Sequence, residues 1–287
     1  MWLLLLFIHA FALAGFNLSL RKSLINKVDP FTLATVMQTG IAIPLAVVYI
    51  FRPVSFDAYQ LTDYMILALL ILLTISLHIS NVKALQYLEK GVYSIIYNLR
   101  LLIVTVLGIL FLSEDVVWLR ILGGVLIFLA IVIVKQKGNR SVRVKGFEWG
   151  IIAAFVISFL NLTEKTLINN VGILNYFPFA MIAAAAIMWT YLLFIKKEKV
   201  DKNLLVQPQM LQLMVLRAVS AYGFPFALAS GALLSVANYI SGLSVIIMVA
   251  LGALLLGERD YLLRKTIATG VAVLGLTIIL ISGLIYY

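Results

Sequence analysis

The sequence contains no cysteine, so it holds neither a disulfide framework nor a thiolate metal site. Charged residues are scarce: they are 12% of the chain, against about a quarter in soluble domains. There are two histidines, and the spacings typical of zinc proteases, EF-hands, Walker A loops and nucleophile elbows are absent. These absences argue against an enzyme, a resident metal or cofactor, and a water-soluble globular protein.

Long apolar runs fill the chain instead. Of its 287 residues 63% are hydrophobic, and the mean hydropathy is +1.10. A bilayer core needs about 20 apolar residues per helix, and the chain has ten runs of that length separated by short connections. We therefore predict an all-α membrane protein with ten transmembrane helices, at 2–20, 31–51, 62–82, 91–112, 117–134, 147–168, 175–195, 208–229, 233–256 and 262–285.

The basic residues predict how the chain sits in the membrane. Counting Lys and Arg in alternate connections gives 17 on one side and only Arg52, Arg120 and Lys165 on the other. Such excess charge marks the cytoplasmic side, so we expect a multi-pass protein of the cell (plasma) membrane with both termini extracytoplasmic. The net charge of +10 then implies contact with anionic membrane lipids and no nucleic acid.

The chain repeats itself at an offset of 144 residues. Between Val92 and Arg120, 11 of 29 positions are identical to their partners, and Asn17 falls on Asn161. Because each copy has five spans, the second copy enters the membrane from the opposite side. We predict two inverted five-helix repeats, 1–137 and 147–287, joined by a basic cytoplasmic linker at 138–146; this architecture is typical of secondary transporters.

The repeated segments also resemble a known family. Ala84-Leu85-x-Tyr87, Leu107-Gly108-x-Leu110-x-Leu112-Ser113-Glu114 and Gly123-Gly124, with Leu251-Gly252-x-Leu254-x-Leu256-Gly257-Glu258 in the second copy, are similar to the EamA-like repeat of the drug/metabolite transporter superfamily. The resemblance implies an exporter or exchanger of small metabolites or drugs without specifying the substrate. We interpret Glu114 and Glu258 as helix caps, since each precedes an apolar span.

Two arginines lie near the centres of predicted spans and are the strongest site candidates. Arg100 is in the fourth span and shares a helical face with Tyr93 and Tyr97, and Arg217 is in the eighth span. A cation at the bilayer centre costs about 2.5–3.5 kcal/mol when unpaired, so neither should face lipid. The pair predicts a site for an anionic group, although bracing of helices is an equal alternative for each arginine.

Other polar residues inside spans form a second tier of substrate-binding candidates. His78, Asn17 and Asn238 are the members we select, although hydrogen bonds between helices explain such residues more commonly. Glu164 is the single acid in the interior of a predicted span, since Asp63 and Glu148 are each only the second residue of theirs. Glu164 and His78 are therefore the candidates for proton coupling.

The leading hypothesis is a secondary active transporter that moves a small polar or amphipathic metabolite by alternating access. Its substrate would carry a carboxylate or phosphate, as an amino acid does, and its direction would be export. Coupling to protons or a counter-substrate, and a monomer or homodimer, stay open. The alternatives are a flippase or exporter of a lipophilic or lipid-linked compound and a membrane receptor or scaffold without transport.

Overall fold

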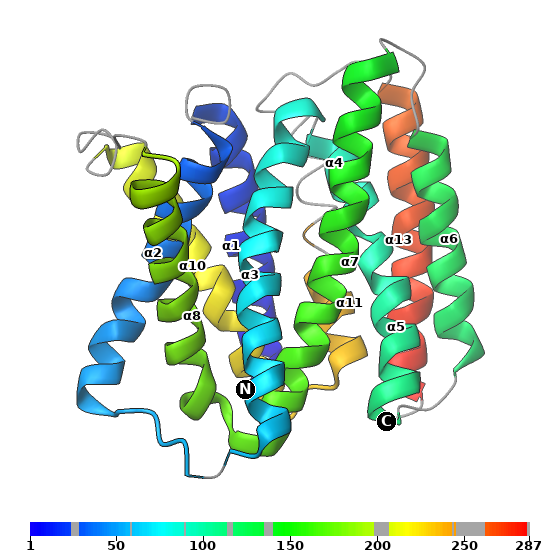
Figure 1. Cartoon of the computed structure of the whole chain (residues 1–287). Helices are drawn as coiled ribbons and strands as arrows, with labels where there is room; N and C mark the ends of the chain where they lie inside the picture. Colours follow the sequence, from blue (N-terminus) through cyan, green and yellow to red (C-terminus); the bar gives the residue numbers. More distant parts are fainter. Residues whose placement is uncertain are drawn as a thin grey trace.

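Helices stand side by side in one bundle (Figure 1). The computed structural model describes residues 1–23, 29–57, 59–88, 90–113, 117–134, 140–197, 207–242, 244 and 262–285, and these contain no strand. The helices are α1 (Trp2–Ser23), α2 (Pro30–Phe51), α3 (Leu61–Tyr87), α4 (Lys90–Tyr97), α5 (Leu99–Leu112), α6 (Trp118–Val134), α7 (Arg140–Val171), α8 (Ile173–Thr190) with a π-helical turn η1 (Tyr191–Ile195), α10 (Pro208–Ala229), α11 (Leu234–Gly242) and α13 (Leu262–Ile285).

Six helices of the described chain are long and apolar enough to cross a membrane: α1, α2, α3, α7, α8 with η1, and α10. They coincide with six of the predicted spans. Helix also occupies the described parts of the other four ranges, in α4 and α5, α6, α11 and α13. The all-α membrane class is thus observed, whereas ten crossings in two inverted repeats stay a prediction.

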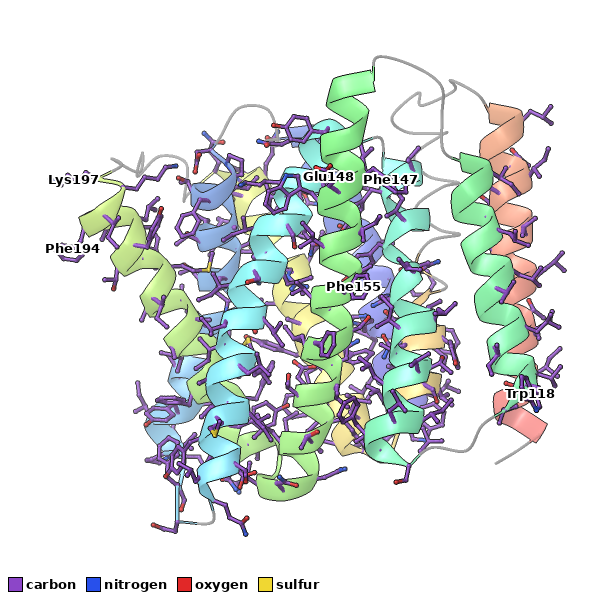
Figure 2. The ribbon with its side chains drawn as sticks, turned by 45° about the vertical axis from the view of Figure 1, so that its right-hand side comes forward. Trp118, Phe147, Glu148, Phe155, Phe194 and Lys197 are labelled. Atoms are coloured by element: carbon purple, nitrogen blue, oxygen red, sulfur yellow. The ribbon has the colours of Figure 1, made fainter. Side chains whose placement is uncertain are left out.

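The outer surface suits a bilayer. Phe155 is 46% exposed on α7 and points outward at mid-height, and Trp118 is 77% exposed at the lower end of α6 (Figure 2). Glu148 and Lys197 lie near the upper end of the bundle (Figure 2). Apolar side chains at mid-height with charges and a tryptophan near the ends match the profile of a membrane.

The fourth predicted span is broken. We expected one helix over 91–112, but α4 ends at Tyr97 and α5 begins at Leu99. Asn98 keeps a right-handed helical conformation, and its carbonyl accepts a hydrogen bond from the N–H of Leu101 at 2.9 Å, three residues on. This tighter turn bends the path of the chain while keeping the right-handed sense of the helix.

An ion pair and a helix cap lie at the start of α2. The Asp29 carboxylate accepts hydrogen bonds from the N–H groups of Phe31 and Thr32 and pairs with Lys196 at 2.7 Å. Partial burial alone raises the pKa of Asp29, but Lys196 and the two N–H groups outweigh it and lower the pKa below its ordinary value. The proposed caps Glu114 and Glu258 lie outside the described residues. Residues 140–146 of the predicted linker belong to α7.

Helices far apart in sequence pack in four main pairs: α1 with α10, α3 with α7, α2 with α8, and α6 with α13. Two glycines permit the closest approaches. A Cβ on Gly40 of α2 would lie 2.6 Å from the Cβ of Met214, and one on Gly223 of α10 would lie 2.9 Å from the Cβ of His9. Each half of the chain therefore finds its main partners in the other half.

Candidate functional site

A cavity opens in the middle of the bundle, between residues of both halves. It offers about 80 Å³ to the centres of water-sized molecules, where one water needs about 10–15 Å³, so it has room for several waters or a small solute. Its polar and charged lining consists of His9, Asn17, Thr74, His78, Asn81, Tyr93, Tyr97, Arg100, Asn161, Glu164, Arg217 and Ser220.

The predicted trio on the fourth span meets in this cavity. The rings of Tyr93 and Tyr97 stack with centroids 5.5 Å apart, and the Arg100 guanidinium lies 4.9 Å from the centroid of the Tyr97 ring. The Tyr93 hydroxyl donates to the Asn81 side chain on α3. Arg100 is 3% exposed, and its Nε has no hydrogen-bond partner. A buried guanidinium with an unused N–H is a ready donor to an anion.

Arg217 lines the same cavity from α10, with its guanidinium 5.7 Å from the centroid of the Phe16 ring. It is close enough to interact electrostatically with His78 and Glu164. No ion pair within 4 Å joins Glu164 to Arg217 or Arg100, all three of which the structure describes. His78 is buried, and its Nε2 has no hydrogen-bond partner. The cavity therefore holds two cations and one acid that are not paired with one another.

The two asparagines predicted as substrate contacts differ in their position relative to the cavity. Asn17 and its repeat partner Asn161 both line the cavity. Asn238 does not: its side-chain oxygen accepts from the Asn161 amide at 2.8 Å, and its own amide donates to the Leu234 carbonyl at 3.0 Å. Asn238 thus joins α11 to α7, and we do not retain it as a substrate contact.

His9 was not selected from the sequence as a site residue, and its contact with Ser241 was not foreseen. His9 lines the cavity from α1, and its ring nitrogens lie 2.7 Å from the Ser220 carbonyl oxygen and 2.8 Å from the Ser241 hydroxyl. Arg100 donates to the same hydroxyl at 2.8 Å. His9 and Ser241 are 232 residues apart, and no pattern along one span reveals such a pair.

The first half of the chain is similar in sequence to a known family. Residues 1–135 match the profile described as the EamA-like transporter family. The first half of the chain is thus similar to that family. The EamA-like segment covers α1 to α6 and brings His9, Tyr93, Tyr97 and Arg100 to the cavity.

Solved structures share the fold of the whole chain. Matches were found to 28 chains. One, described as "Crystal structure of protein", is 17% identical, covers 96% of this chain and 95% of its own length, and has a TM-score of 0.66. Identity this low shows the fold alone. A comparison with curated proteins found no match.

The EamA-like match confirms the resemblance seen in the repeated motifs. Together with the membrane-spanning helices, it indicates a multi-pass membrane transporter that meets a small-molecule substrate and lipids. The matched profile is that of a transporter family.

Proposed function

We propose that this EamA-like protein is a secondary active transporter of a small metabolite that carries a carboxylate or phosphate, and that it exports this metabolite across the plasma membrane by alternating access. The observation that carries the proposal is the central cavity, in which Arg100 and Arg217 have no acid within ion-pair distance among the residues that the structure describes. A buried cation without a counter-charge is costly to the empty protein. An anionic ligand in the cavity supplies the missing charge.

Alternating access requires two halves that rock about a central site, and we propose that residues 1–137 and 147–287 are these halves. The helix pairs support the proposal. Exchanging the repeats turns α1 into α7 and α10 into α3, so the contact of α1 with α10 becomes the contact of α7 with α3; both pairs are extensively packed. The pairs α2 with α8 and α6 with α13 map onto themselves. This is the pattern that a two-fold relation between repeats produces.

The charges of the cavity residues indicate which group of the substrate each of them binds. Arg100 and Arg217 bind the anionic end, and the tyrosines beside Arg100 offer hydroxyls and ring faces. Glu164 and His78 exchange protons with the cavity or bind a cationic group such as an ammonium. An amino acid or another compound with both charges satisfies all of these side chains together.

Substrate identity is found by thermal-shift screening of the purified protein against amino acids, organic acids, nucleotides and phosphorylated sugars. A ligand at 100 times its dissociation constant stabilises by about 2.7 kcal/mol. Any stabilising compound is then tested for flux in proteoliposomes.

The Arg100→Gln variant tests the site. A charge-assisted hydrogen bond is worth about 1.5–3 kcal/mol, so we expect at least about tenfold weaker binding and transport with folding preserved. The matched control is Arg52→Gln, the same change at an exposed residue after α2, which should transport normally. Unchanged flux in Arg100→Gln would assign Arg100 to helix packing and contradict the proposal.

A further inference from the structure

A chain of three hydrogen bonds crosses the boundary between the two halves and ends on Arg100. His9 of α1 meets the Ser220 carbonyl of α10 through Nδ1 and the Ser241 hydroxyl of α11 through Nε2. Arg100 of α5 donates through Nη2 to the same Ser241 oxygen at 2.8 Å. His9, Ser241 and Arg100 are each at most 7% exposed.

For a neutral His9 ring, donor and acceptor accounting fixes the direction of every bond. A carbonyl oxygen only accepts, so the proton of His9 lies on Nδ1, and Nε2 of the neutral ring is an acceptor. The Ser241 hydroxyl has one hydrogen and donates it to Nε2, which leaves its lone pairs to the Arg100 guanidinium. An imidazolium at His9 would instead donate from Nε2 to the Ser241 oxygen, so that two buried cations, His9 and Arg100, would share the lone pairs of one hydroxyl.

Close packing around His9 and Arg100 restricts the side chains that form these hydrogen bonds. Gly223 lies one turn from Ser220 on α10, and any Cβ there would lie 2.9 Å from the Cβ of His9 and 2.9 Å from the Leu5 carbonyl. The His9 ring also packs against Phe224 with centroids 5.4 Å apart. On its other side Arg100 is held by the Tyr97 ring.

We propose that His9 and Ser241 are positioning residues for Arg100. The neutral Nδ1–H form of His9 orients the Ser241 hydroxyl, which anchors Nη2 of Arg100, so that the unpartnered Nε–H is held ready for the anionic group of the substrate. The proposal rests on the proposed function for the role of Arg100, and it adds the two residues that set its geometry.

The first experiment reads the tautomer directly. The chain has two histidines, so ¹⁵N-histidine labelling gives two ring systems, and a His78→Gln variant assigns them. We expect His9 to show a protonated Nδ1 and a hydrogen-bonded, unprotonated Nε2, with the Nε2 signal displaced in Ser241→Ala. An Nε2–H tautomer, an imidazolium, or no displacement in Ser241→Ala overturns the proposal.

The second experiment measures Arg100 itself with phenylglyoxal, an arginine reagent, and quantifies its adduct by peptide mass spectrometry. The coupling between residues of one hydrogen-bond network corresponds to a factor of about three or more in a rate or an equilibrium constant. We therefore expect Ser241→Ala and His9→Leu to change the labelling rate of Arg100 at least about threefold. His9→Gln supplies one donor and one acceptor without titrating, and it should restore the wild-type rate. The control is Ser80→Ala, because the buried Ser80 hydroxyl bonds only to carbonyls of its own helix.

Failures of the two proposals give different results. If Arg100→Gln transports normally, the proposed substrate contact fails whatever His9 does. If Arg100→Gln is impaired while Ser241→Ala and His9→Leu label and transport like the wild type, the positioning role alone fails. With both correct, Ser241→Ala raises KM more than it lowers kcat, and it has no further effect in an Arg100→Gln background.

Discussion

Charge in this chain is mostly placed at helix ends, and Arg100, Glu164 and Arg217 are exceptions that face a shared interior cavity. Such residues are expensive inside a membrane and generally mark a functional pathway. Glu164 is 5% exposed and lies within electrostatic reach of Arg217. Its protonation state therefore changes the charge that a substrate meets in the cavity.

We predict that Glu164→Gln uncouples transport from protons. With a one-unit pH gradient across proteoliposomes, exchange of one proton per substrate supports about tenfold accumulation. The wild type should reach accumulation of this order with the compound found by screening, whereas Glu164→Gln should only equilibrate it.

Glu148→Gln is the matched control, because Glu148 is exposed on α7 near the upper end of the bundle (Figure 2). Accumulation that survives in Glu164→Gln and disappears in His78→Gln would assign the coupling to His78 instead.

Residues on one span were predictable, and pairs between spans were not. Tyr93, Tyr97 and Arg100 are spaced by four and three, so helical geometry alone places them on one face, and they do meet in the cavity. Nothing in the sequence says which helix lies opposite that face. His9 was not selected for this reason, and the bond between Asn161 and Asn238 was not foreseen, since each contact joins residues of different spans.

At the scale of helices, apolar runs located the elements well because the bilayer fixes their length. The break at Asn98 escaped prediction, since neither proline nor glycine marks it. Close helix contacts were equally invisible: Gly40 and Gly223 look like ordinary span residues until the facing helix is known.

Gly223 provides a test of the contact between α1 and α10. Gly223→Ala inserts a methyl group 2.9 Å from the Cβ of His9 and from the Leu5 carbonyl, and overpacking of this kind costs about 1–3 kcal/mol. We expect a lower melting temperature in detergent and loss of the His9 Nδ1 hydrogen bond in the ¹⁵N spectrum. Gly270→Ala is the control: a Cβ there meets nothing within 4 Å, and alanine favours helix over glycine by about 1 kcal/mol. Equal melting temperatures for the two variants would contradict the tight contact.

At the scale of the whole molecule, the predicted orientation is open to a direct test, because the protein has no native cysteine. Asp57 is exposed between α2 and α3, and Gln207 is exposed just before α10. From the excess of basic residues we expect position 57 outside the cell and position 207 inside. A membrane-impermeant maleimide should label Asp57→Cys on intact cells and label Gln207→Cys only after lysis. The reverse pattern would invert the orientation and with it the direction assigned to export.

The packing of helices from one half against helices of the other also affects how the protein folds during its synthesis. α1 has its main partner in α10 and α3 has its main partner in α7, yet the ribosome delivers the first half first. At about 5–20 residues per second, α1 waits roughly 10 to 40 s in the bilayer before α10 emerges. During that interval His9 and Arg100 have neither Ser220 nor Ser241 to bond, so the nascent first half must be shielded by the insertion machinery or by lipid headgroups. A ribosome that stops after α6 releases a polypeptide without a cavity, which membrane quality control should recognise by its unpaired polar side chains.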